Sequence, residues 1–92
     1  MIKNFKNKKL EDFFCDGKKK GISADHVQKL MDILDRLDAV HVVKDINYPG
    51  SSLQCLKGKL KGTWVVTISG NWRLTFRFED GQAHYVDYLD YH

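Results

Sequence analysis

The spacing of apolar residues changes near residue 52, and this change restricts the possible folds of the chain more than any other feature. Before it, apolar side chains recur every three to four residues, as on one face of an α-helix. After it, they alternate with polar side chains, as in a β-strand. Helices followed by consecutive strands are typical of an α+β domain. We therefore expect N-terminal helices packed on one face of an antiparallel sheet whose other face is uncovered.

The first predicted helix has clear start and stop residues. Asn7 can cap its first turn, and Gly17 can end it in a left-handed conformation. Between them, Leu10, Phe13 and Phe14 have the spacing of one helical face. These residues predict an amphipathic helix.

A second helix is predicted from the N-cap Ser23 to about Ala39. Its apolar residues recur at helical spacing and are expected to form the buried stripe. They are Val27, Leu30, Leu34 and Leu37.

The second half of the chain predicts strands over 64–68, 72–78 and 83–89. A further short strand is expected at 2–5, and Tyr48-Pro49-Gly50 predicts a turn. Asp80-Gly81 is typical of a two-residue type I′ hairpin turn.

This hairpin predicts a register in which Arg77 lies opposite His84, Arg73 opposite Tyr88 and Asn71 opposite Asp90. Strict alternation would then gather guanidinium, imidazole, phenol and carboxylate groups on the uncovered face, a combination suited to RNA chemistry. The residues expected there are Arg73, Arg77, His84, Tyr88, Asp90 and His92.

The charge distribution points the same way. Lys and Arg total 15 and Asp and Glu total 12, a net charge of +3. Residues 51–77 carry five of the bases and no acid, as a phosphate-binding surface requires. A solvated face that only maintains solubility is the alternative for each single lysine. For the whole segment we favour nucleic-acid binding.

The 92 residues contain no linker, so we expect one domain over 1–92. No apolar run approaches the ~20 residues of a membrane helix. The start MIKNFKNKKL has no apolar core of a signal peptide, and two distant cysteines, Cys15 and Cys55, form no disulfide framework. A cytoplasmic protein is expected.

Several motifs together resemble the HigB toxins of bacterial toxin–antitoxin modules, within the RelE/ParE superfamily. The resemblance covers nearly the whole chain and is closest in the C-terminal half. The segments that carry it are Leu56-Lys57-Gly58, Gly62-Thr63-Trp64, Asn71-Trp72-Arg73-Leu74-Thr75-Phe76, Asp87-Tyr88-Leu89-Asp90-Tyr91-His92, Ile2-Lys3-Asn4-Phe5-Lys6 and Leu34-Asp35-Arg36-Leu37-Asp38-Ala39.

The resemblance implies a ribosome-dependent endonuclease that cuts mRNA in the A site of the small subunit, on a fold with helices on one side of an antiparallel sheet. It implies inhibition by a HigA-like antitoxin with a helix-turn-helix domain, operator DNA being contacted only through that antitoxin. No membrane, metal or other cofactor is expected, and the sequence contains no HExxH motif or His/Cys cluster.

Four residues are candidates for the chemistry. His92 titrates near neutral pH and suits acid/base catalysis, although a terminal residue can equally be frayed. Asp90 can orient His92 or act as base, or be only an exposed strand-end carboxylate. Tyr91 can stack on a base, bind phosphate, or cap the core edge. Arg73 can hold phosphate with two hydrogen bonds or pair structurally with Asp90.

Further residues are predicted to bind RNA. Lys57 and Arg77 supply positive charge, and Gln54 can position a phosphate. The family often has His at the position of Gln54 and Arg at that of Ser69. We therefore expect Asp90 and His92 to share the proton transfers. Docking to ribosomal RNA, with simple solubility as the alternative, is assigned to Lys18, Lys19, Lys20, Lys59 and Lys61.

Other conspicuous residues are expected to be structural. His26 and His41 are predicted on the surface, Cys15 is predicted to be a small buried apolar residue, and Trp64 and Trp72 are predicted in the core.

Two alternative functions remain. One is a ParE-like toxin that inhibits DNA gyrase, which would need no acid/base residues at its C-terminus; trapped gyrase cleavage complexes would identify it. The other is a non-catalytic basic RNA-binding module, which Gln54 and Ser69 leave open. Overexpression that leaves growth and mRNA intact would identify it.

Overall fold

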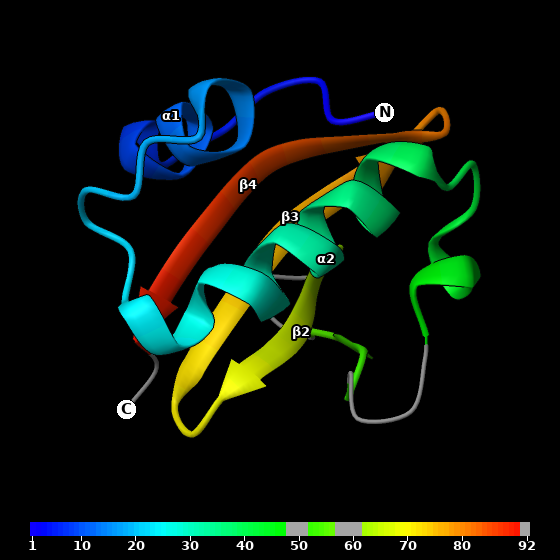
Figure 1. Ribbon diagram of the computed structural model, residues 1–92. Coiled ribbons are helices and arrows are strands. Elements are labelled where there is room, and N and C mark those ends of the chain that lie inside the picture. Colours follow the sequence, from blue (N-terminus) through cyan, green and yellow to red (C-terminus); the bar gives the residue numbers. More distant parts are fainter. Residues whose placement is uncertain (48–51, 57–61, 91–92) are drawn as a thin grey trace.

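The computed structural model describes residues 1–47, 52–56 and 62–90, and in this part of the chain the predicted α+β fold is confirmed. A four-stranded antiparallel sheet in the order β1-β2-β3-β4 packs with two α-helices (Figure 1). The elements are α1 (Lys8–Asp16), the 3₁₀ turn η1 (Ala24–His26), α2 (Val27–Ala39), the 3₁₀ turn η2 (Val43–Ile46), β1 (Gln54–Cys55), β2 (Thr63–Ser69), β3 (Trp72–Glu79) and β4 (Gln82–Asp90).

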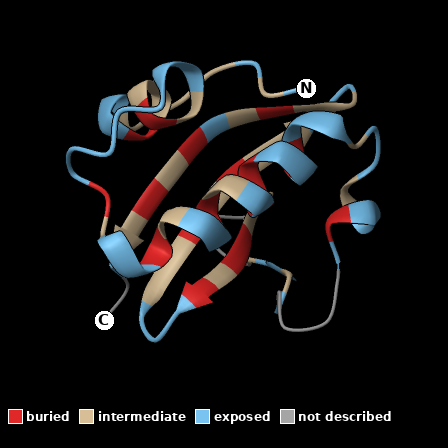
Figure 2. Cartoon of the chain, in the orientation of Figure 1, coloured by how far each residue is buried: buried red, intermediate tan, exposed pale blue. Residues whose placement is uncertain are grey.

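The core lies between α2 and the sheet. Helix α2 crosses one face, α1 flanks β4, and the buried residues of α2 lie on its sheet-facing side (Figures 1 and 2). Apolar burial in this layer is the main favourable contribution to stability. Among the buried residues are Leu10, Phe13, Leu30, Ile33, Leu34, Leu37, Val66, Ile68, Leu74, Phe76 and Val86.

Helix α1 begins and ends as predicted. The Asn7 side-chain oxygen accepts a hydrogen bond from the Leu10 backbone N–H at 3.1 Å. Gly17 adopts a left-handed φ of 72° and its N–H donates to the Phe13 carbonyl at 3.0 Å. The Asn7 amide also donates to the Tyr88 carbonyl at 3.2 Å, which ties the start of α1 to β4.

Helix α2 ends at Ala39 as predicted but begins later than expected. Ser23 makes no side-chain capping bond, and a 3₁₀ turn precedes the first α-helical residue, Val27. Val27 is half-buried, whereas Ile33, which was not predicted in the stripe, is buried. Ile33 lies three residues after Leu30 and so shares its helical face.

The β3–β4 hairpin has the predicted turn. Asp80 and Gly81 have φ values of 54° and 74°, as a type I′ turn requires. Glu79 lies opposite Gln82, and Arg77 lies opposite His84. The predicted pairing is therefore confirmed for the first part of the hairpin.

Beyond Arg77 the predicted pairing is wrong, because β4 contains a β-bulge. Tyr85 is the extra residue, with a φ of 55°, and the register shifts between Thr75 and Arg77. The pairs after the bulge are Thr75–Asp87, Leu74–Tyr88, Arg73–Leu89 and Trp72–Asp90.

A one-residue shift exchanges the two faces of a strand. Tyr88 and Asp90 therefore belong to the helix-covered face of the sheet and do not share a face with Arg73. The predicted placement of these two residues on the uncovered face was wrong. Asp87 and Leu89 take their places on the uncovered face.

The N-terminal segment is extended, as predicted, but forms isolated bridges with β4 in place of a regular strand. It runs parallel to β4, with bridges from Ile2 to Ala83 and from Phe5 to Val86. The Lys6 backbone N–H donates to the Val86 carbonyl at 2.9 Å. This segment therefore lies directly beside the bulge.

Three burial predictions need correction. His26 is only 7% exposed, because the 3₁₀ turn before α2 directs its ring toward the sheet. Cys15 is exposed, since it lies two residues from buried Phe13 and thus on the opposite side of α1. Trp64 and Trp72 are half-buried against the core.

His41 is exposed as expected, and the predicted turn at 48–50 lies outside the described residues. In the part of the chain that the structure describes, no helix has the length and apolar character needed to span a bilayer.

Candidate functional site

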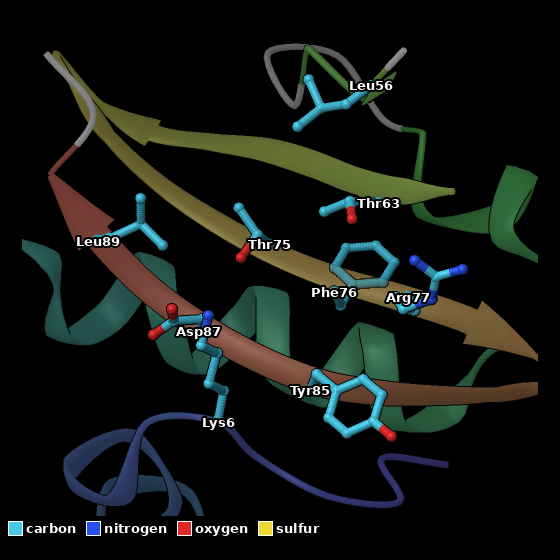
Figure 3. A pocket seen from close by; sticks show the side chains of 9 residues that line it. All are labelled: Lys6, Leu56, Thr63, Thr75, Phe76, Arg77, Tyr85, Asp87 and Leu89. Carbon is cyan, nitrogen blue, oxygen red and sulfur yellow. The ribbon is translucent and has the colours of Figure 1, made fainter. Parts of the chain in front are cut away.

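A concave pocket of about 530 Å³ lies on the uncovered face of the sheet (Figure 3). Its volume is in the range of about 300–1,000 Å³ that is typical of small-ligand sites. The side chains that line it come from the N-terminal segment, the residue after β1, and strands β2, β3 and β4. They are Lys6, Leu56, Thr63, Thr75, Phe76, Arg77, Tyr85, Asp87 and Leu89.

Arg77 contributes a guanidinium group to this pocket. Its Nε lies 3.5 Å from the Glu79 carboxylate. A Cβ on Gly62 would lie 2.9 Å from the Arg77 Nη2, and Gly62 also has a φ of 91°. Gly62 therefore provides both the backbone conformation and the space that let the Arg77 side chain lie over the start of β2.

Arg73 lies on the same face but does not line the pocket. Its Nη1 donates hydrogen bonds to the carbonyls of Gly70 and Trp72, the latter at 3.1 Å. The guanidinium is thus anchored at the turn between β2 and β3. The structure brings Arg77, and not Arg73, together with the other pocket residues.

Some of the remaining predicted site residues are described by the structure but do not line the pocket, and the others lie outside the described part of the chain. Asp90 is the exposed last residue of β4, and Gln54 is exposed in β1 opposite Val65. Residues 18–20 are exposed after α1 and do not line the pocket. The residues outside the described part of the chain are Lys57, Lys59, Lys61, Tyr91 and His92.

Lys6, Tyr85 and Asp87 are among the pocket residues that the sequence analysis missed. A signal for two of them exists. The buried residues Ala83 and Val86 are three positions apart, where a regular strand requires an even spacing. The extra position is the bulge that brings Tyr85 and Asp87 to the uncovered face.

The opposite face carries an aromatic cluster, defined here as buried His26 and Tyr88 together with half-buried Trp72. His26 Nδ1 and the Tyr88 hydroxyl share a hydrogen bond of 2.7 Å. The Trp72 and Tyr88 rings stack with centroids 4.6 Å apart, and His26 meets Trp72 edge-on at 5.5 Å. This cluster fixes the end of β4 to the start of α2 and to the β2–β3 hairpin, all at one end of the molecule (Figure 1).

Burial raises the pKa of Tyr88, and a hydrogen bond from the Ser23 backbone offsets this only in part. Because the folded pKa lies above the ordinary value of about 10, the folded protein holds this proton more tightly than the unfolded chain. We expect the contribution of Tyr88 to the free energy of unfolding to be fully present below pH ~10. This contribution should be lost as the pH rises through the raised pKa.

Ultraviolet titration of tyrosinate should show a component, from Tyr88, that ionises above the ordinary tyrosine pKa of about 10. This late component should disappear in Tyr88→Phe and persist in Tyr85→Phe, the matched control at an exposed position. A native protein without a component that ionises above the ordinary range would contradict the prediction.

Within the described residues, no group of three or more His, Cys, Asp or Glu side chains has the arrangement of a metal site.

Comparison with known proteins gives the family context of this pocket. The family model described as "RelE-like toxin of type II toxin-antitoxin system HigB" matches residues 3–92. Endoribonuclease HigB of Proteus vulgaris is 38% identical over 92 residues, the full length of both chains. Toxin HigB-1 of Vibrio cholerae serotype O1 is 34% identical over 94 residues, which cover all of this chain and 98% of that protein.

Proposed function

The chain belongs to the HigB family of RelE-like toxins of type II toxin–antitoxin systems, and from this membership we propose that it is a ribosome-dependent endoribonuclease that cleaves mRNA in the A site. As a toxin of this family it has an antitoxin partner. The Proteus vulgaris relative is named an endoribonuclease, which supports nuclease activity over gyrase inhibition or RNA binding without catalysis.

The observation that carries the proposal is the pocket on the uncovered face. Among the described residues, the cationic side chains of Lys6 and Arg77 come from different segments and line one concavity, as binding of a phosphate backbone requires. Helix α2 covers the other face, so the pocket face is the side of the sheet on which RNA can lie.

We propose a metal-independent cleavage in which the 2′-OH of one nucleotide attacks the adjacent phosphate. One group removes the 2′-OH proton, another protonates the leaving 5′-oxygen, and cations stabilise the charge of the transition state. We assign the proton transfers to His92 and to Asp90, which would act from the end of β4 and not from within the pocket. Arg73 and Lys57 stabilise charge at the phosphate.

Two further residues support binding in this proposal. Tyr91 stacks on a base or donates a hydrogen bond to phosphate, and Gln54, exposed on β1, positions the RNA backbone. Docking to ribosomal RNA involves the basic residues Lys18, Lys19, Lys20, Lys59 and Lys61.

We further propose that the antitoxin is HigA-like, with a helix-turn-helix domain that alone contacts operator DNA. The toxin acts in the cytoplasm, where its ribosomal partner and mRNA are found.

Primer extension on mRNA recovered from ribosomes exposed to the protein tests the proposal. We expect cuts within A-site codons with the full chain and none with a chain that lacks residues 91–92. Cuts on free mRNA at the same rate would contradict ribosome dependence. Intact mRNA together with trapped gyrase cleavage complexes on plasmid DNA would contradict the nuclease proposal.

A further inference from the structure

Tyr85 has an unusual conformation for a large aromatic residue. It is 57% exposed and has a left-handed φ of 55°, a region that bulky side chains rarely adopt. In a regular strand, the residue after His84 would point to the helix-covered side. The bulge instead lets Val86 fill the core position, fully buried, and leaves Tyr85 on the uncovered face.

Contacts from the N-terminal segment hold this conformation. The Tyr85 backbone N–H donates to the Asn4 side-chain oxygen at 2.6 Å. On the next residue, the Val86 N–H donates to the Asn4 carbonyl at 3.3 Å, and the Val86 carbonyl accepts from the Lys6 N–H at 2.9 Å. Strained backbone that is held by several specific bonds is a feature of functional sites.

The side chains around the Tyr85 ring are of the types that can bind a nucleotide. Tyr85 lines the pocket with the cations Lys6 and Arg77 and with the carboxylate of Asp87 (Figure 3). One Asp87 oxygen accepts the Tyr88 backbone N–H at 2.9 Å, which orients the carboxylate. An aromatic ring can stack on a base, a cation can hold its phosphate, and a carboxylate can accept a hydrogen bond from an exocyclic amino group.

We propose that this pocket is a nucleobase subsite in which one mRNA base stacks on Tyr85 and presents an amino group to Asp87. This proposal rests on the proposed function, because the ligand is a nucleotide of the mRNA that the toxin cleaves. The carboxylate favours bases with an exocyclic amino group, adenine, cytosine or guanine, over uracil. Tyr85 and Asp87 are therefore specificity-determining residues and not the groups that transfer protons.

The test is single-turnover cleavage of mRNA on programmed ribosomes, measured over a range of toxin concentrations. Loss of one stacked base typically weakens binding by about ten- to a hundred-fold. We therefore expect Tyr85→Ala to raise the toxin concentration for half-maximal rate by about that factor, with a smaller change in the maximal rate. Tyr85→Phe, which keeps the ring, should remain within about twofold of the unsubstituted protein.

Two further variants guard against effects on folding. Asn tolerates left-handed backbone, so Tyr85→Asn removes the ring without adding strain at this position. Val42→Ala truncates another apolar residue, which is 53% exposed and does not line the pocket, and should leave cleavage unchanged.

Asp87→Asn tests the proposed base specificity. It keeps an oxygen for the Tyr88 N–H and should reduce the discrimination against codons with uracil at the sensitive position.

The outcomes separate the two proposals. Unchanged half-maximal concentrations for Tyr85→Ala and Tyr85→Asn, with the unsubstituted chain active, would overturn the subsite and leave the nuclease function standing. An equal loss in Tyr85→Phe and Tyr85→Ala would overturn stacking. An unsubstituted chain that leaves ribosome-bound mRNA intact would overturn the proposed function itself, and the subsite with it.

Discussion

The substitution His92→Ala is expected to slow single-turnover cleavage of mRNA on programmed ribosomes by about 10²-fold or more. A positioned acid or base contributes typically 10²–10⁴-fold to a proton-transfer step, and imidazole is the side chain that titrates nearest to neutral pH. The rate should be measured with toxin in excess over ribosomes, so that binding and product release do not limit it.

Two controls make this result specific. His41→Ala removes an exposed histidine from the connection after α2 and should cleave at the normal rate. His92→Gln keeps hydrogen-bonding capacity without a proton that titrates near neutral pH, so it should be as slow as His92→Ala and should flatten the pH–rate profile. A rate for His92→Ala close to normal would remove His92 from the proposed mechanism.

The substitution Leu34→Ala should strongly destabilise the fold. Leu34 is fully buried between α2 and the sheet. Truncation of such a leucine costs about 2–5 kcal/mol, because apolar transfer free energy is lost and a cavity remains. The total free energy of unfolding of a small domain is only about 5–15 kcal/mol, so much of it would be lost.

Urea unfolding, followed by circular dichroism, measures this change. Val42→Ala, at an exposed position, should change the free energy of unfolding by no more than about 0.5 kcal/mol. We propose that residues 1–92 unfold as one domain, and both variants should then show a single transition. A loss below ~1 kcal/mol for Leu34→Ala would contradict the tight packing of α2 on the sheet.

Measurements of both cleavage and stability distinguish the effects expected for Leu34→Ala and His92→Ala. Below its unfolding transition, Leu34→Ala should cleave at a near-normal rate per folded molecule, because Leu34 lies on the side of the sheet away from the pocket. His92→Ala should show the reverse, with normal stability and little cleavage, since the role proposed for His92 is in proton transfer.

Several local features were predicted correctly from the sequence, although the side-chain cap at Ser23 was not. The cap at Asn7, the stop at Gly17 and the turn at Asp80-Gly81 all depend on residues within a few positions of one another. The pairing of β3 with β4 was also predicted up to Arg77, because a two-residue turn dictates the register next to it.

The candidate site was predicted only in part. Its location on the uncovered face and the presence of Arg77 there followed from charge and alternation. The prediction that Tyr88 and Asp90 lie on that face was wrong, because the bulge shifts the register of β4 by one residue. His26 was not predicted to be the buried partner of Tyr88. Each of these errors follows from a contact between distant parts of the chain.

The amino-acid sequence by itself determined the α+β fold, the two helices, the tight hairpin and the basic character of the second half. Only the tertiary structure decided which side chains of β4 face the pocket. The bulge at Tyr85 is held by Asn4, 81 positions away, and the end of the strand by His26, 62 positions from Tyr88. Alternation along one strand contains no information about such partners, because they act only once the chain has folded.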